Sequence, residues 1–396
     1  MVMFSFRRQQ IVVGVMSVVL VVFFSVLIMK MGYPSPDQGR WPDHPDRAFS
    51  MEGSWRIAQG QVPHRDFSTV VGPAWIYGNA LSVMLVGSEY ARAMPLGIVM
   101  MLVLLSGLAL AITLRRSIPV IGMLSVFYIA EFLTESPFLE YNGVGYIFFW
   151  LILLEAFTPP ERSWKNMGWI TGALLGVLLF WKLNFFLAAV VTVSLLPLVI
   201  SKTRHWALSV MGGFVLAAMF FLTLIRWHVG AWIHDLSIPF MVKTSSVLSV
   251  MSNGSYHLSL LKESWWMLVG AGIVFLWAWS RQSSIAEARW KHWLKGGLLL
   301  TVLLALQNFL VMTNARPWAA EAVPWLIILA WTWGMAPTAS ARGWWNSTSA
   351  IGVMGLLSIG VVGVFWWPVF RGSVDHVRAF AQIRQQTVEI NDQTYW

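Results

Sequence analysis

Repeated apolar runs, each about as long as a bilayer is thick, limit what this chain can fold into more than any other feature. The first run, residues 11–29, reads IVVGVMSVVLVVFFSVLIM and contains no charged residue. An α-helix needs about 20 apolar residues to cross a bilayer, and a soluble globular chain carries about 25% charged residues. This chain is 57% hydrophobic and only 11% charged. We therefore predict an all-α polytopic membrane protein.

Further apolar runs follow along the chain, each bounded by Pro, Gly or charged residues. They predict a bundle of about 11 transmembrane helices. We assign the bundle to one domain, residues 1–367, followed by a short outer tail, residues 368–396. The spans expected after the first are 94–114, 118–134, 143–158, 167–183, 186–200, 206–224, 264–280, 296–313, 322–336 and 349–367.

The loop charges predict the orientation of the chain. Arg7 and Arg8 precede the first span, which indicates an uncleaved first helix with a cytoplasmic N-terminus. The segment 70–87, VVGPAWIYGNALSVMLVG, is also apolar, but if it crossed, every later Lys/Arg-rich loop would lie outside. The positive-inside rule therefore predicts that 70–87 is an interfacial or re-entrant helix, broken near Gly72. Residues 31–92 then form a long first loop on the outer face.

Several function classes have no basis in this sequence. Cysteine is absent, which excludes thiol catalysis, thiolate metal sites and disulfides. The net charge of +9 is not gathered in a soluble basic domain, so no nucleic-acid partner is expected. There is no P-loop, dinucleotide fingerprint or serine-triad motif. No His/Asp/Glu cluster has metal-ligand spacing either, so we assign no metal and require no cofactor.

A polar stretch in the first outer loop, DHPDRAFSMEGSWRIAQGQVPHRDF (residues 43–67), contrasts with the apolar chain around it. Four apolar residues recur there at helical spacing: Ala48, Met51, Trp55 and Ala58. They predict a short amphipathic helix that lies on the bilayer surface and ends at Gly60. Glu52 and Arg56 form an i,i+4 pair on its polar face.

The acids at the start of this helix allow two interpretations. Carboxylates at a membrane boundary are candidates for function. Alternatively, Asp43 is the N-cap of the helix, Pro45 lies in its first turn, and Asp46 interacts with the helix dipole. Both roles can coexist on neighbouring aspartates, so the residues alone leave the choice open.

A family resemblance rests on the same region. The order Asp46, Arg56 ten residues later, then GQVPHRDF and GPAWIYGNALSVMLVG resembles the first outer loop of the C-type membrane glycosyltransferases, which use polyprenyl-phosphate sugars. The protein-mannosyltransferase and aminoarabinose-transferase-like group is the most similar. The likeness covers roughly residues 43–90, with His64 in the place of the usual Tyr. It implies a GT-C-like bundle whose outer face transfers a sugar from the lipid carrier to a glycan, lipid or protein acceptor.

The resemblance also implies roles for individual residues. It places the catalytic base at Asp46, which would take the proton of the acceptor hydroxyl while the lipid phosphate leaves, with inversion at the anomeric carbon. Asp43 and Asp66 are the alternative or supporting acids. From the residues alone, Asp66 and Arg65 form either a structural pair after a turn or a contact to substrate.

The second outer loop supplies further polar candidates for reading the sugar. An acid in this loop assists the acceptor site or a metal in the resembling families, which leaves a divalent cation open. The alternative is an exposed loop whose polar groups are satisfied by water. With Arg65, the predicted substrate-binding residues are Glu135, Glu140, Tyr141 and Asn142.

A lipid phosphate needs cations near the membrane surface. Lys182, between two predicted spans, is the first candidate, and Arg316 and Lys243 are the others. The alternative for Lys182 is a lysine that snorkels to the interface. His234 and Asp235 could form an oriented imidazole, but adjacent residues rarely face each other, so we expect a structural or sugar-contacting role.

Two other functions would suit a chain of this kind. A transporter or flippase of lipid-linked glycans would carry ionisable residues inside its spans, often in repeated halves. Here the acids gather in the outer loops, and Glu131 and Glu155 are the main exceptions. A polymerase or ligase of lipid-linked glycans would carry its large outer loop late in the chain, whereas here it comes first. We therefore expect a transferase in the bacterial inner (plasma) membrane, with its active site outside.

Overall fold

The computed structural model describes residues 2–30, 45–87, 90–115, 119–135, 139–157, 168–199 and 204–238. The chain divides into two compact units, residues 1–336 and 337–396, and all described residues belong to the first. Their regular structure is helical, as predicted. The helices are α1 (Val2–Lys30), α2 (Pro45–Ala58), α3 (Pro73–Val86), α4 (Tyr90–Arg115), α5 (Pro119–Glu135), α6 (Tyr141–Phe157), α7 (Gly168–Trp181), α8 (Leu183–Val199) and α9 (Arg204–Leu224). A further helical segment covers residues 229–238.

Apolar length identifies a membrane protein. Within the described ranges, three helices are long and apolar enough to cross a membrane: Gln10–Lys30, Arg92–Leu114 and Arg204–Leu224. On α1, Val18 and Phe23 are exposed, and on α9 Leu216 is exposed in the same way. Large apolar surfaces of this kind are not stable in water and are suited to lipid contact.

The remaining predicted spans fall into two groups. The helices expected at 118–134, 143–158, 167–183 and 186–200 are present as α5 to α8, with ends within three residues of the prediction. That each of them crosses a membrane stays a prediction, and so does the total of about 11 spans. The spans expected after residue 238 and the tail 368–396 lie outside the described residues.

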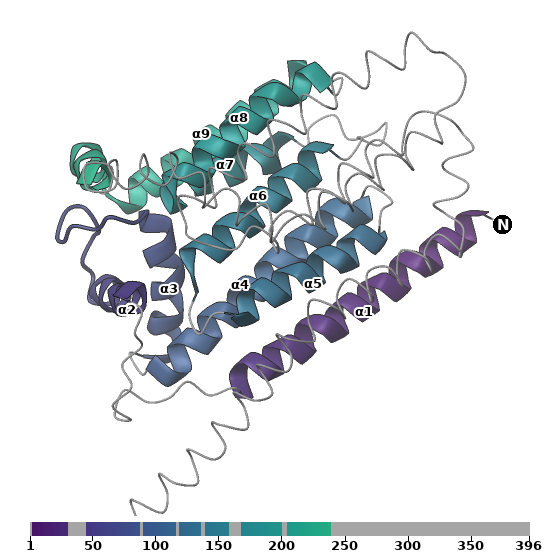
Figure 1. Ribbon diagram of the computed structural model, residues 1–396, viewed down its shortest axis with the longest axis horizontal. Coiled ribbons are helices and arrows are strands. Elements are labelled where there is room, and N and C mark those ends of the chain that lie inside the picture. Colours follow the sequence, from purple (N-terminus) through teal and green to yellow (C-terminus); the bar gives the residue numbers. More distant parts are fainter. Residues whose placement is uncertain are drawn as a thin grey trace, which may run out of the picture. The chain divides into compact units, whose positions relative to one another are not determined.

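α1 and α4 run in opposite directions. The side-chain amide of Gln10 donates to the Leu114 carbonyl oxygen at 3.1 Å, so the start of α1 adjoins the end of α4. α3 has 14 residues, about 21 Å of helix against a hydrocarbon core of about 30 Å. Figure 1 shows α3 inclined to α4, α5 and α6, at their far end from the N-terminus. That this helix lies in the membrane interface or re-enters the membrane stays a prediction.

Small residues bring helices α7 and α9 into close contact. Gly168, Gly172 and Gly176 are spaced four apart and therefore lie on one face of α7. A Cβ atom on Gly172 would lie 1.9 Å from the Val210 carbonyl oxygen of α9. Glycines at such spacing allow the backbones of membrane helices to approach each other. The backbones of α7 and α9 are therefore in direct contact, and residues 225–238 follow immediately after α9.

Helix α2 packs on α3 through a face that the apolar pattern did not indicate. Its buried residues are Ser50, Gly53, Ser54 and Ile57. Gly53 is so close to Ile76 of α3 that an added Cβ would lie 2.8 Å from its side chain. On the predicted apolar face, Ala48 and Trp55 are exposed, where a bilayer surface can cover them, and Met51 and Ala58 are half-buried. Two predictions are confirmed: the Glu52–Arg56 ion pair has an N–O distance of 2.6 Å, and Gly60, at φ 82°, follows the helix end.

Candidate functional site

The segment GQVPHRDF forms a compact turn held by its own side chains. Asp66 accepts a hydrogen bond from the backbone N–H of Val62 at 2.7 Å. The Arg65 guanidinium donates two hydrogen bonds to the same carboxylate, at 2.8 and 2.5 Å. The bonds from Arg65, and then that from Val62, lower the pKa of Asp66 to about 2. Asp66 is therefore a poor proton acceptor near neutral pH, and the geometry favours the structural Arg65–Asp66 pair over a second base.

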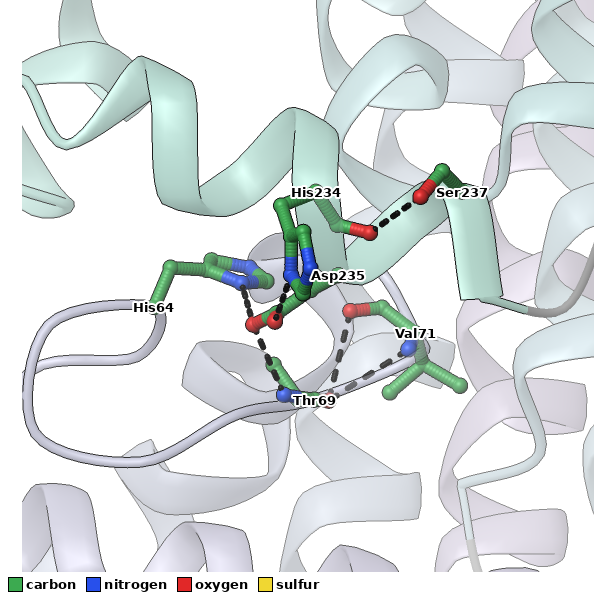
Figure 2. A network of polar contacts seen from close by, with 6 residues as sticks. All are labelled: His64, Thr69, Val71, His234, Asp235 and Ser237. Carbon is green, nitrogen blue, oxygen red and sulfur yellow. Dashed lines mark hydrogen bonds and ion pairs between the residues drawn. The ribbon is translucent and has the colours of Figure 1, made fainter.

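A buried histidine and a buried aspartate connect this turn to a distant part of the chain. His64 Nδ1 lies 2.8 Å from the carboxylate of Asp235, which comes 171 residues later, and the two side chains are 0% and 4% exposed. The backbone N–H of Thr69 donates to the same carboxylate oxygen at 3.1 Å. Figure 2 shows the imidazole and the Thr69 backbone converging on Asp235. The pair thus fastens the first loop to the segment 229–238.

The neighbouring His234 is not the main partner of Asp235. The ring of His234 is 76% exposed and its Nδ1 lies 3.7 Å from Asp235, so the adjacent residues form at most a loose contact. Asp235 instead binds His64. Nothing in the sequence connected position 64 to residue 235.

Protons in the His64–Asp235 pair have defined positions. Burial raises the pKa of Asp235, but the hydrogen bonds from His64 and Thr69 outweigh it, and the pKa lies below its ordinary value. Asp235 is therefore a carboxylate, which can only accept, so His64 Nδ1 must be the donor. Burial lowers the pKa of His64 despite the opposing bond to Asp235. The ring is accordingly neutral at pH 7, with its lone pair on Nε2.

A second polar cluster forms around Lys182, the residue between α7 and α8. Its ammonium group donates to the side-chain oxygen of Asn142 and lies 4.1 Å from the ring centre of Tyr141. The Asn142 amide donates in turn to Glu140 at 3.3 Å. Four predicted site residues therefore lie together, although 40 positions separate Lys182 from Asn142.

The start of α3 lies directly against this cluster. Trp75 donates through its indole N–H to the Leu139 carbonyl at 2.6 Å, and its ring meets that of Tyr141 edge-on at 5.1 Å. Gly72 approaches α7 so closely that an added Cβ would lie 2.0 Å from the Phe180 carbonyl oxygen. The first loop therefore adjoins the Lys182 cluster, although the two lie far apart in the sequence.

Aromatic contacts connect the segment 229–238 to the same region. Trp232 stacks on Phe180 of α7 with ring centres 4.6 Å apart. Tyr77 of α3 donates its hydroxyl hydrogen to the Leu224 carbonyl at 2.9 Å. The His64–Asp235 pair and the Lys182 cluster are thus supported by the same two helices, α3 and α7.

The other predicted site residues are less completely described. Asp46 lies in the first turn of α2 and Glu135 is the last residue of α5, but only their backbones are described. Asp43, Lys243 and Arg316 lie outside the described residues. In the part of the chain that is described, no group of three or more His, Asp or Glu side chains could hold a metal ion.

Comparisons with models of known protein families, with curated proteins and with solved structures found no match to this chain.

Proposed function

We propose that this protein is a membrane glycosyltransferase that moves a sugar from a polyprenyl-phosphate carrier to a hydroxyl acceptor. The observation that carries the proposal is the position of Lys182, whose ammonium group lies beside Tyr141 and Asn142, next to the start of α3. A cation, an aromatic ring and amide groups at one place suit a sugar phosphate, whose charge and hydroxyls need different partners. The likeness of residues 43–90 to the C-type transferases gives the reaction class.

The environment of Lys182 supports a role in the site over simple snorkelling. A snorkelling lysine directs its ammonium group into water. Lys182 is half-buried, and its ammonium group is held by Asn142 and the Tyr141 ring. A cation that is partly shielded from water acts more strongly on a nearby phosphate than an exposed one.

In the proposed reaction the acceptor oxygen attacks the anomeric carbon of the donor. The new bond forms between that oxygen and the anomeric carbon, the bond from the anomeric carbon to the phosphate oxygen breaks, and the electron pair stays on the lipid phosphate. The proton of the acceptor hydroxyl passes to Asp46, the first-turn acid of α2. Lys182 stabilises the departing phosphate. We place this site on the outer face of the plasma membrane, from the loop charges.

Paired variants test the proposal in cells that carry or lack the gene. Mass spectrometry of lipid-linked glycans and surface glycans is expected to show a missing sugar in cells without the protein. Asp46→Asn and Lys182→Met should reproduce that loss. The matched controls are Glu52→Gln, on the exposed side of α2, and Lys30→Met, at the exposed end of α1. An unchanged glycan profile in cells without the protein would refute the function, and full transfer by folded Asp46→Asn would refute the base.

One observation favours a second candidate, a transporter of lipid-linked glycans. Glu155 is fully buried in α6 and accepts a hydrogen bond from the Thr171 hydroxyl of α7. Buried carboxylates within membrane segments often belong to transport pathways. A transporter predicts that cells without the protein accumulate complete lipid-linked glycans on the cytoplasmic side. It also predicts that Glu155→Gln has the same effect, whereas a transferase predicts accumulation of the lipid-phosphate sugar donor.

A further inference from the structure

The second ring nitrogen of His64 has no partner in the described part of the chain. His64 Nε2 is buried, and within those residues it forms no hydrogen bond. Buried polar atoms are nearly always hydrogen-bonded, because water is lost without replacement when they are not. The buried, unpartnered Nε2 of His64, in the loop with the family resemblance, is therefore a candidate atom for hydrogen bonding to a ligand.

The pairing with Asp235 determines what kind of ligand His64 can bind. Nδ1 holds the proton and donates it to the carboxylate, which the Thr69 N–H holds in place. Rotation of the ring would break the bond to Asp235, so Nε2 presents a lone pair in a fixed direction. A neutral lone pair repels phosphate and accepts from an O–H or N–H group. His64 thus complements Lys182, which suits an anion.

Backbone strain is concentrated in the two segments that this pair joins. Among the described residues, the non-glycine positions with positive φ are His64 at 64°, Arg226 at 50° and Trp227 at 61°. His64 lies in the first-loop turn, and the other two lie in the turn between α9 and residues 229–238. Residues other than glycine rarely adopt a positive φ unless the surrounding structure imposes it. Such positions cluster at sites that hold a ligand. The Trp227 side chain is also half-exposed. An aromatic ring needs an accessible face to stack on a sugar.

We propose that His64, oriented by Asp235, is a hydroxyl-binding residue whose Nε2 accepts a hydrogen bond from a sugar hydroxyl of the substrate. The inference rests on the proposed function, because that function supplies the sugar. It adds a site that the resemblance does not contain, since the resembling loops carry Tyr at this position.

Two variants of His64 separate ligand binding from the contact with Asp235. His64→Asn places an amide N–H near the position of Nδ1, so it keeps the bond to Asp235 and removes the Nε2 acceptor. His64→Gln places an amide oxygen near the position of Nε2, so it keeps an acceptor and loses the bond. We expect His64→Asn to melt at the wild-type temperature, yet to transfer sugar about five- to tenfold less efficiently, the effect of one lost hydrogen bond. His64→Gln should melt lower and retain more transfer per folded molecule. The opposite ranking of the two variants in transfer would overturn the proposal.

A second measurement does not depend on transferase activity. The full-length protein, purified in detergent with 15N-labelled histidine, contains eight histidines, and the His64 resonances are those lost in His64→Asn. Ligand-free protein should show Nδ1 protonated and Nε2 bare. A mixture of methyl glycosides of common hexoses and pentoses should shift Nε2, and inorganic phosphate should not. Two results would overturn the proposal. In the first, Nε2 is already hydrogen-bonded before any addition, since the chain itself would then supply the donor. In the second, no glycoside shifts the Nε2 resonance. If the wild type transfers no sugar but Nε2 still responds to glycosides, the proposed function fails and the hydroxyl site stands.

Discussion

Gly72 passes so close to the end of α7 that it has no room for a side chain. A Cβ atom there would lie 2.0 Å from the Phe180 carbonyl oxygen and 2.5 Å from that of Trp181, whereas ordinary contacts begin at 3.4 Å. In Gly72→Ala the first loop and α7 must therefore separate by about 1.4 Å. The backbone of Gly72, at φ −63° and ψ 139°, is open to alanine, so the effect is steric alone.

The size of the effect follows from this displacement. Overpacking of a tight contact costs about 1–3 kcal/mol of unfolding free energy. Lys182 comes directly after Trp181, so a shift at this contact also moves the ammonium group relative to the first loop. A misplacement of about 1 Å at a reacting site can lower the rate about 100-fold. We expect Gly72→Ala to lose stability in the range given and to lower sugar transfer by up to about 100-fold.

A second glycine of the same region provides a matched control. In Gly78→Ala the new Cβ would lie 3.6 Å from the Trp181 ring, an ordinary contact, and alanine inside a helix is about 0.5–1 kcal/mol more stable than glycine. The two variants should therefore change stability in opposite directions. Thermal unfolding of both proteins in detergent, followed by tryptophan fluorescence, measures the difference. If Gly72→Ala melts at or above the wild-type temperature, the close contact between the first loop and α7 is absent and the reasoning is wrong.

Three further predictions concern the His64 pair, the helix contact and the topology. Burial lowers the pKa of His64 below its ordinary 6.5, so as the pH falls the unfolded chain binds a proton at this histidine before the folded chain does. The stability that His64 contributes is therefore fully present above pH 6.5. It is lost as the pH falls, by at most about 1.4 kcal/mol per pH unit. Melting of wild type and His64→Asn between pH 7.5 and 5 checks this, and equal slopes would contradict it. Gly172→Ala places a Cβ 1.9 Å from a carbonyl of α9 and should cost about 1–3 kcal/mol, whereas Gly107→Ala meets no atom within 4 Å and should be tolerated. In the cysteine-free chain, a cysteine at exposed Gln59 should react with a membrane-impermeant maleimide in intact cells and one at Arg204 should not; the reverse pattern would refute the orientation.

Local patterns predicted the helices well because helix formation in a membrane depends mainly on local residues. Apolar length located α4 to α9 within a few residues of their observed ends, since an unpaired backbone is too costly in lipid. The Glu52–Arg56 pair and the stop at Gly60 were predictable for the same reason, because their partners lie within one or two turns. The contact face of α2, with its small residues, was not predictable, because its partner, Ile76, belongs to another helix.

The candidate site was predictable as a set of residues but not as an arrangement. Lys182 and Asn142 were each plausible from loop position and chemistry, yet only the packing of α6 against α7 and α8 brings the cation to the amide, and only the packing of α3 brings the first loop beside them. The pair of His64 and Asp235 lay beyond sequence reasoning altogether. A hydrogen bond depends on distance in space, and 171 residues of chain separate its two partners. The sequence by itself determined a helical membrane protein with a polar first loop, because hydrophobic length and charge act locally. The tertiary structure decided which polar groups meet at that loop, because close backbone contacts at glycines such as Gly72 depend on how the helices pack.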